Sequence, residues 1–238
     1  MSCTAFCLVL AVSALKHECR RARVTEDRER NTSAKGPRHS AVSLEHLLLS
    51  LVRHRARLRS SQLPPRTSDI HGRASVSAWD FWEQIGAPRF VCAPMVDQSD
   101  LPFRLLCRGL GVDLAYTPML HSKQFLTVTH YPSLHFDPHP SDRPVVAQFC
   151  GHDPAIVLEA ARQVQDQVDA IDLNFGCPQA IARKGRYGAF LLDEPDVMVE
   201  LVRTLSDALA VPVFVKLRML PMRNDTVALC KRLQEAGA

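Results

Sequence analysis

The residues best suited to chemistry in this sequence are Cys177 and Asn174, at the end of an apolar run. Alternating apolar and polar residues predict a strand over 171–175, and the Gly before and the Pro after Cys177 put the thiol in a constrained turn. In α/β proteins, the carboxyl ends of parallel strands carry the ligand site. A thiol is largely protonated at neutral pH and can act there as a general acid. The alternative is a buried strand followed by an inert thiol.

The segment after Cys177 is basic and punctuated by glycine. It carries Arg183, Lys184 and Arg186, with Gly185 and Gly188 between and after them. We expect a mobile loop that could hold an anionic group beside the thiol.

Polar residues also end other predicted strands. Near-continuous apolar runs predict strands over 90–95, 114–117, 145–149, 171–175 and 213–218. Helical spacing predicts helices over 100–110, 153–166 and 195–209, and a last one that includes 226–233 and ends at Gly237. Gln148, Lys216 and Arg218 lie at strand ends, where a ligand would meet them. The fold class is therefore α/β: a partial TIM (β/α)8-type barrel of about five parallel strands.

Composition argues against a metal site, a disulfide framework and a membrane span. The chain has 238 residues, a net charge of +4, 46% hydrophobic and 23% charged residues. Eight cysteines without CxxC spacing, and histidines at 121, 130, 135 and 139 that match no metal motif, predict no metal site and no disulfide framework. The sequence has no run of 18 apolar residues, so we expect no contact with a membrane.

The first 75 residues differ from the rest. They carry 14 Lys and Arg against 6 Asp and Glu, whereas residues 76–238 carry 15 against 19. We expect residues 1–75 to be a basic, mostly disordered extension with one amphipathic helix over 43–58. That helix could dock on RNA, a membrane or a partner protein, or simply be solvated. An apolar run over 5–15 resembles a signal-peptide core, but we expect a cytoplasmic protein, with the nucleus or the mitochondrion as alternatives.

Six segments resemble the tRNA-dihydrouridine synthase family, in family order and at family spacing. The resemblance spans residues 90–236 and is strongest to the type that modifies positions 16 and 17 of the D-loop. The segments are CAPMVDQSDLPFR (92–104), AYTPM (115–119), AQFCG (147–151), DLNFGCPQ (172–179), KGRYGAFL (184–191) and VKLR (215–218).

The resemblance implies an FMN-dependent oxidoreductase that acts on tRNA. The sequence does not fix the oligomeric state, and we expect a monomer. In this family NADPH reduces the flavin, the flavin passes hydride to C6 of a flipped-out uracil, and a cysteine protonates C5. By motif that cysteine is Cys177, and Asn174 and Arg218 match uracil-pocket positions. The positions that match FMN contacts are Pro94, Met95, Val96, Gln148 and Lys216.

The sequence also departs from the family. The family's later barrel motifs, its phosphate-gripping turn and its helical tRNA-binding domain have no counterpart, so residues 76–238 are expected to form an incomplete barrel of a truncated synthase. Such a form would bind FMN weakly. The alternatives are a non-catalytic fragment that binds RNA or a protein partner, and another FMN barrel that acts on a small molecule.

Overall fold

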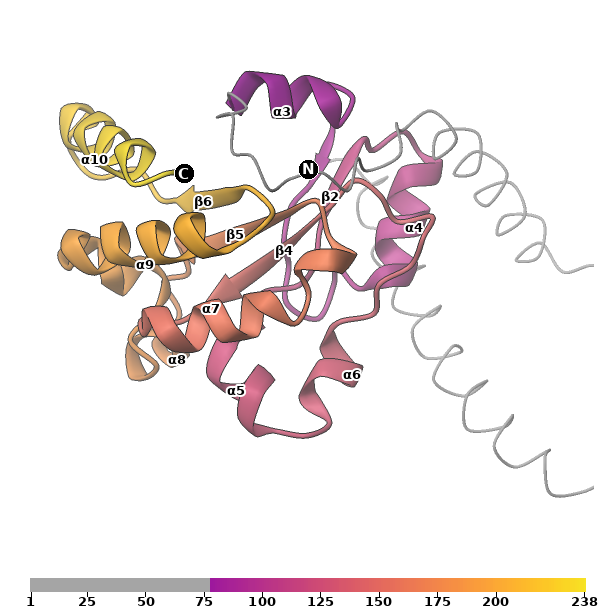
Figure 1. The fold of residues 1–238 in the computed structure, drawn as a ribbon, viewed down its shortest axis with the longest axis horizontal. Helices are drawn as coiled ribbons and strands as arrows, with labels where there is room; N and C mark the ends of the chain where they lie inside the picture. The colour runs from indigo at the N-terminus through magenta and orange to yellow at the C-terminus, as the bar shows by residue number, and fades with distance from the viewer. Residues whose placement is uncertain (1–77) are drawn as a thin grey trace, which may run out of the picture. The chain divides into compact units, whose positions relative to one another are not determined.

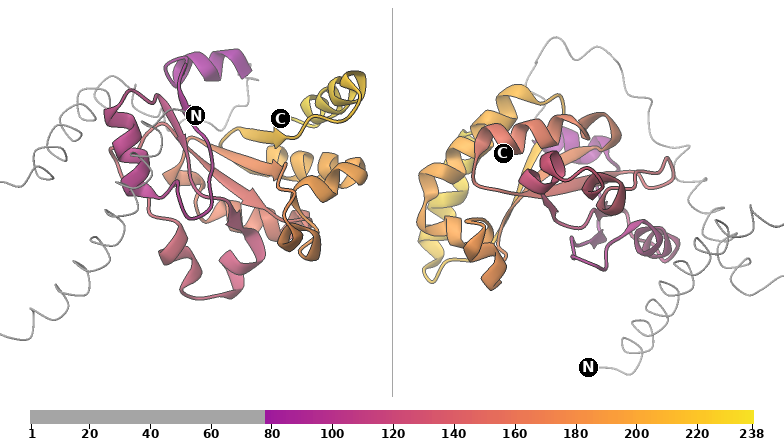
Figure 2. Two further views of the ribbon diagram at one scale, coloured as in Figure 1. Left: turned by 180° about the vertical axis from the view of Figure 1, so that it is seen from behind. Right: turned by 90° about the horizontal axis from the view of Figure 1, so that it is seen from below.

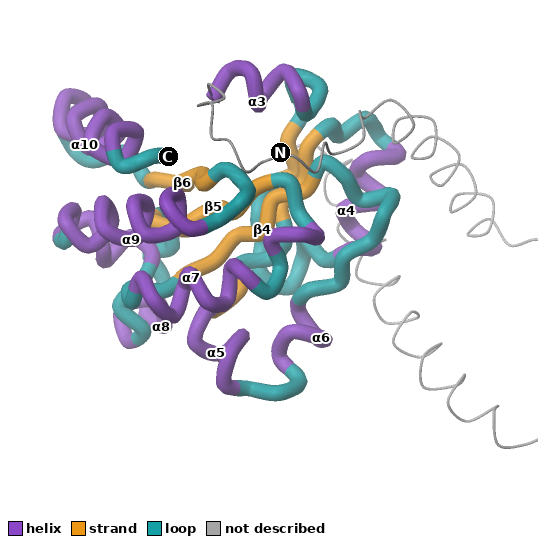
Figure 3. Tube along the Cα trace, in the orientation of Figure 1, coloured by secondary structure: helices purple, strands orange, loops and turns teal. Residues whose placement is uncertain are grey.

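Apolar runs alternating with amphipathic segments form a parallel sheet with helical crossovers in the computed structural model, which describes residues 78–238. The extension over 1–75 and the helix expected over 43–58 lie outside the described residues. Figure 1 shows the strands at the centre and the helices around them, and Figure 3 marks the same elements by type. No helix among the described residues is long and apolar enough to cross a membrane.

The strands follow the predicted order along the chain. They are β1 (Val91–Cys92), β2 (Leu114–Tyr116), β3 (Leu120–His121), β4 (Val145–Cys150), β5 (Ala170–Phe175) and β6 (Val213–Leu217). The α-helices are α3 (Ala78–Gln84), α4 (Leu101–Gly109), α5 (Ser122–Thr127), α6 (Tyr131–His135), α7 (Pro154–Arg162), α8 (Ala180–Lys184), α9 (Pro195–Ala208) and α10 (Arg223–Glu235). Two 3-10 helices complete the set, η1 (Gln165–Gln167) and η2 (Gly188–Asp193).

The strand order is that of a barrel. The sheet runs β1-β2-β4-β5-β6 with every neighbour parallel, and β3 pairs with the far end of β4. Each main strand lies beside the next one in the chain, whereas a doubly wound sheet reverses its order at a switch point. The described residues therefore confirm the predicted α/β class, with five main parallel strands in TIM-barrel order.

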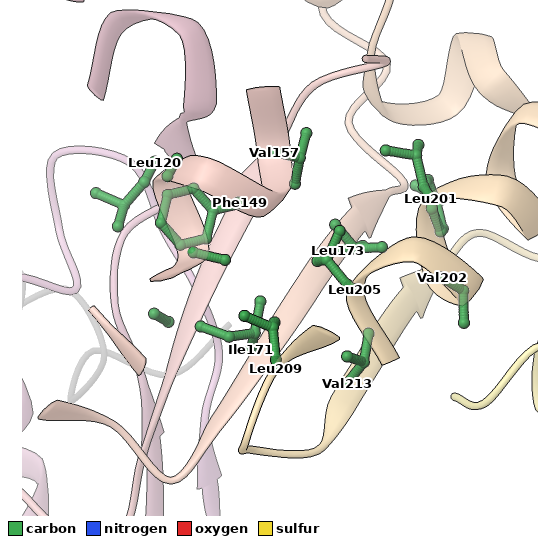
Figure 4. Close-up of a cluster of buried hydrophobic side chains, with 14 of the residues drawn as sticks. Leu120, Phe149, Val157, Ile171, Leu173, Leu201, Val202, Leu205, Leu209 and Val213 are labelled. Atoms are coloured by element: carbon green, nitrogen blue, oxygen red, sulfur yellow. The ribbon is translucent and has the colours of Figure 1, made fainter. Parts of the chain in front are cut away.

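The outer face of the sheet carries the main core. Side chains of β4, β5 and β6 that point outward pack against α7 and α9, and the helix residues Val157, Leu201 and Leu205 are fully buried there. Figure 4 shows these side chains meeting Ile171 and Leu173 between sheet and helices. Because the strands are buried on both faces over much of their length, they read as near-continuous apolar runs.

The inner face has a smaller apolar cluster at its N-terminal end. Leu114, Val146 and Ala170 are buried there, and Phe81 and Trp82 of α3 pack against them. Figures 1 and 2 show α3 across the sheet from α7 and α9. Phe81 also meets Phe214 edge to face, with ring centroids 5.8 Å apart. The aromatic segment before β1 thus covers the bottom of the inner face, while the opposite end is left to polar residues.

The region between β2 and β4 contains three elements that the apolar pattern did not predict. It contains β3, α5 and α6, and β2 and β3 act as one interrupted strand along β4. At the break, the Thr117 N–H donates to the Val146 carbonyl at 2.9 Å, and the Thr117 hydroxyl accepts from the Gln148 N–H at 3.1 Å. The side chain therefore replaces a carbonyl that the broken strand does not supply. Sequence periodicity could not reveal this, because the break carries only three residues.

Two predicted elements are clearly shorter than expected. The strand expected over 90–95 shrinks to β1, since Phe90 is exposed and Pro94 has no N–H for a ladder. The helix expected over 153–166 ends at Arg162 and is followed by η1, although the buried Val164 and Val168 continue the i, i+3 and i+4 spacing of its apolar face.

A buried ion cluster joins α4 to the segment before β4. Asp142 accepts from Arg104 and Arg108, each at 2.7 Å, and all three side chains are nearly inaccessible. Arg108 also donates to the Pro144 carbonyl at 2.6 Å, and Arg104 donates to the Ser99 carbonyl at 2.7 Å. The cluster satisfies its own charges by hydrogen bonds, as buried ions require.

Candidate functional site

Three inward-facing polar side chains form a chain of hydrogen bonds at the carboxyl end of the sheet. The strand register pairs Gln148 of β4 with Asp172 of β5, so the two side chains share one face. Gln148 Nε2 donates to Asp172 Oδ2 at 2.7 Å, and Asn174 Nδ2 donates to Gln148 Oε1 at 2.9 Å. Asp172 and Gln148 are 1% exposed. Asn174 is half-buried and lies nearer the carboxyl end of the strands, which we call the mouth of the site. The sequence therefore places a continuous polar ladder inside an otherwise apolar strand pair.

The ladder ends on the turn that carries Cys177. Asn174 Oδ1 accepts from the backbone N–H groups of Gly176, at 3.1 Å, and Cys177, at 2.9 Å. An Asn side chain that bonds to the backbone two and three residues later stabilises a turn in place of further strand. This confirms the predicted turn and brings Asn174 and Cys177 together, as the sequence indicated.

The segment after Cys177 closes tightly over it. The Ala189 N–H donates to the Cys177 carbonyl at 2.9 Å, and a β-carbon at Gly188 would lie 2.5 Å from that oxygen. Gly188 has φ +70°, which favours glycine. The Cys177 side chain is half-buried and packs against a cluster that contains Cys150 and Tyr187. Burial raises the pKa of Tyr187 to about 12, so its hydroxyl stays protonated at neutral pH.

The buried carboxyl of Asp172 has an unusual titration. Burial raises its pKa to about 7, against the opposing effects of the Gln148 hydrogen bond and the positive charge of Lys216. The same carboxylate and burial raise the pKa of Tyr116, burial being the larger cause. Perturbed groups of this kind gather at functional sites, although structural networks produce them too.

Lys216 and Arg218 extend the site from β6. The register pairs Lys216 with Asn174, which puts the lysine beside the mouth, and its side chain is exposed. Arg218 Nε donates to the Gly176 carbonyl at 3.2 Å, so the guanidinium contacts the turn that carries Cys177. Both side chains therefore lie where the sequence predicted, at the end of the last described strand.

The predicted residues after β1 form a compact turn. The Met95 N–H donates to the Ser99 hydroxyl at 2.9 Å, and that hydroxyl donates to the Met95 carbonyl at 3.1 Å. Pro94 and Met95 are half-buried and Val96 is exposed. Ser99 itself is fully buried over the Arg104 guanidinium. Through the bond from Arg104 to the Ser99 carbonyl, the ion cluster of α4 helps to fix this turn.

The basic segment beyond Cys177 contains α8 and η2, where a mobile loop was expected. Arg186 pairs with Glu194 at 3.0 Å, and Arg183 lies 6.0 Å from the centre of the Phe190 ring. The Gly185 carbonyl lies 3.2 Å from His152 Nδ1. Arg183, Lys184 and Arg186 are exposed. These contacts hold the segment against the end of β4 while its charges remain open to solvent.

Sequence reasoning missed Asp172, Ser99 and Thr117. Asp172 did carry a signal, since a carboxylate in the middle of an apolar strand must find a partner when buried. Ser99 and Thr117 gave none, because both act through contacts that depend on tertiary structure. Among residues 78–238, no group of three or more His, Cys, Asp or Glu side chains could hold a metal ion.

Comparison with known proteins matches residues 91–238 to the family described as dihydrouridine synthase. The rat "tRNA-dihydrouridine(16/17) synthase [NAD(P)(+)]-like" protein is 46% identical over 165 residues, which cover 68% of this chain and 38% of that protein. The Saccharomyces cerevisiae tRNA-dihydrouridine(16/17) synthase [NAD(P)(+)] is 46% identical over 160 residues, 66% of this chain and 38% of its own. The human "tRNA-dihydrouridine(20a/20b) synthase [NAD(P)+]-like" protein is 35% identical over 150 residues, 62% and 47% respectively. The chain spans less than half the length of these relatives.

Proposed function

The chain belongs to the dihydrouridine synthase family, and on that basis we propose that it reduces uridine to 5,6-dihydrouridine in the D-loop of tRNA. The greater identity to the 16/17-type relatives than to the 20a/20b type favours positions 16 and 17. The observation that carries the proposal is the hydrogen bond that Asn174 Oδ1 accepts from the Cys177 N–H. It joins the amide that would face the uracil to the thiol that would protonate it.

Cys177 is the general acid in this proposal. Its Sγ–H donates the proton that C5 of the uracil gains, after C6 has received hydride. The side chain is half-buried in a turn held by Asn174 and by Ala189, so the thiol has a fixed position. Asn174 and Arg218 both bond to the backbone of Gly176 in this turn and would bind the edges of a flipped-out base. Flipping costs a few kcal/mol, which these contacts and stacking must offset.

The donors at the mouth fit a flavin ring system. Lys216 offers an exposed ammonium, and Gln148 has a second amide N–H besides the one bonded to Asp172. FMN, reduced by NADPH, would supply the hydride. Lys216 and Gln148 would bind the polar edge of the ring, and the turn of Pro94, Met95 and Val96 would flank it. The lysine charge would oppose the negative charge that reduction places on that edge.

The partner in this reaction is tRNA. The exposed Arg183, Lys184 and Arg186 lie in the segment that closes over Cys177, where phosphates of a bound RNA could pair with them. Phosphate contacts position a nucleic acid without reading its sequence. The base would then be selected within the site.

Incubation of the chain with unmodified tRNA, FMN and NADPH tests the proposal. We expect dihydrouridine at positions 16 and 17, detected by mass spectrometry of nuclease fragments. A tRNA with cytidine at both positions is the matched control and should gain none. Cys177→Ala should lower the rate at least 100-fold with flavin binding unchanged, in line with the typical contribution of general acid catalysis. Dihydrouridine formation at the wild-type rate in this variant would refute the role of the thiol.

A further inference from the structure

The hydrogen-bond ladder of Asp172, Gln148 and Asn174 has a fixed direction. An ionised carboxylate can only accept, so Asp172 requires the NH₂ group of Gln148 to face it. At the other end, the backbone N–H groups of Gly176 and Cys177 can only donate, so the oxygen of Asn174 must face them. Each amide is therefore oriented by a partner that can only accept or can only donate a hydrogen bond.

Reversal of either amide would break the ladder. If Gln148 turned over, its oxygen would meet the Asp172 carboxylate, and its NH₂ would meet the NH₂ of Asn174. Two such mismatches at buried atoms leave polar groups unsatisfied, which costs far more than one net hydrogen bond contributes. The carboxylate thus selects one of the two orientations of the Gln148 amide. Gln148 and Asn174 lie between this carboxylate and the Cys177 turn.

We propose that Asp172 is a positioning residue, which orients Gln148 and thereby fixes the acceptor for the Asn174 NH₂ group, so that Asn174 is held against the turn that presents Cys177. Only the catalytic use of this turn rests on the proposed function. The hydrogen bonds that position the turn are present in the chain whether or not it is a synthase. Asp172 lies two residues further from the carboxyl end of β5 than Asn174, and its Oδ2 accepts from Gln148, so it acts through its neighbours rather than on a ligand. Replacement by a neutral amide removes the one acceptor that cannot donate, and leaves Asn174 alone to set the orientation of Gln148.

The charged and titratable groups around Asp172 are Lys216 on β6 and Tyr116 on β2. The neighbours toward the bottom of the inner face, Phe214 of β6 and Phe81 of α3, carry no charge. The raised pKa of about 7 places the change of charge within a measurable range. Protonation would turn the carboxyl into a group that can also donate, so the ladder should loosen as the pH falls through this value.

A titration of the wild-type chain tests the coupling without any ligand. We expect the side-chain NH₂ resonances of Gln148 and Asn174 to shift together between pH 5.5 and 8.5, with one midpoint close to the Asp172 pKa. In Asp172→Asn both shifts should vanish. The matched control is Asp169→Asn, since Asp169 is a partly buried carboxylate of the same chain segment that bonds to Arg143 and to Val145 N–H instead. Asn174 resonances that do not move in the wild-type chain would overturn the proposal.

Hydrogen exchange of the turn gives a second readout. We expect the Gly176 and Cys177 amides to lose protection by about tenfold in Asp172→Asn, roughly the worth of one charge-assisted hydrogen bond. The amides of β4 and β5 should keep theirs, and Asp169→Asn should leave the turn unchanged. A uniform loss across the sheet would show that Asp172 is merely structural. Because neither measurement needs flavin or tRNA, failure here and failure of dihydrouridine formation are distinguishable.

Discussion

Gly188 lies directly against Cys177. A β-carbon added at Gly188 would lie 2.5 Å from the Cys177 carbonyl oxygen and 3.0 Å from the Cys177 β-carbon. The two residues are eleven positions apart in the sequence, and η2 begins at the glycine. The segment after the thiol therefore acts as its outer wall. This wall exists only because one position lacks a β-carbon.

Gly188→Ala is expected to destabilise the chain and to release the Cys177 turn. Positive φ and overlap with backbone atoms together should cost about 2–4 kcal/mol. Gly86→Ala is the matched control, since Gly86 also has positive φ but nothing within 4 Å of an added β-carbon. It should cost about 1–2 kcal/mol. Urea unfolding measures both, and equal losses would show that contact with Cys177 does not matter.

The same pair should differ in thiol reactivity. Cys177 in Gly188→Ala should react faster with iodoacetamide, because the wall must shift away from it, whereas Gly86→Ala should match the wild-type rate. Quantitative mass spectrometry of the Cys177 peptide separates this thiol from the others. A wild-type rate in Gly188→Ala would mean that the wall does not limit access.

Asp142→Ala should be among the most destabilising single changes in the described part of the chain. It would leave Arg104 and Arg108 buried without their carboxylate, at a cost of about 3–5 kcal/mol. Asp196→Ala is the control, because its ion pair with Arg232 is short but the carboxylate is 92% exposed. That change should cost less than about 0.5 kcal/mol. Similar unfolding midpoints for the two variants would contradict the role of burial.

Asp172 should make stability fall as the pH rises. Its pKa is raised from 3.8 to about 7 on folding, so the native state holds the proton more tightly. The stabilisation that this proton provides is complete below about pH 4 and is lost as the pH approaches 7. Asp172→Asn cannot ionise, and its stability relative to the wild type should rise by on the order of 2–4 kcal/mol across that window. Urea midpoints at pH 4.5, 6 and 7.5 measure the difference, which should not stay constant.

Lys216→Met should weaken FMN binding without unfolding the chain. One charge-assisted hydrogen bond is worth about 1.5–3 kcal/mol, so the dissociation constant should rise about 10–100-fold. Lys231→Met removes an exposed lysine from α10 and serves as the control. Flavin fluorescence titrations of both variants give the comparison. An unchanged affinity in Lys216→Met would remove the lysine from the cofactor site.

Most of the fold could be predicted because it depends on local patterns. The run 171–175 followed by Gly176 and Pro178 indicated both the strand and the turn of Cys177, and the register then brought Asn174 and Lys216 together at one edge. Helix ends were less accurate: α7 ends at Arg162 although Val164 and Val168 continue the spacing of its buried face, so periodicity alone extended the predicted helix too far.

The ladder itself could not be predicted from the sequence. Hydrophobic patterning says that Gln148 and Asp172 share a strand pair with apolar neighbours, but not which residues lie opposite each other. The register that joins them depends on packing of the outer face against α7 and α9. Partners that are 24 residues apart in the chain become visible only once that packing exists.

The hydroxyl of Thr117 limits which substitutions the break between β2 and β3 can tolerate. It is the acceptor for the Gln148 N–H, so Ala or Val at this position would orphan a buried donor within the strand that begins the ladder. In a saturation library scored for folded protein, only Ser should survive in its place, while Lys123, an exposed residue of α5, should vary freely. A residue with no proposed part in the chemistry would thus appear as constrained as the Cys177 turn, and a mutational map alone would not distinguish the two.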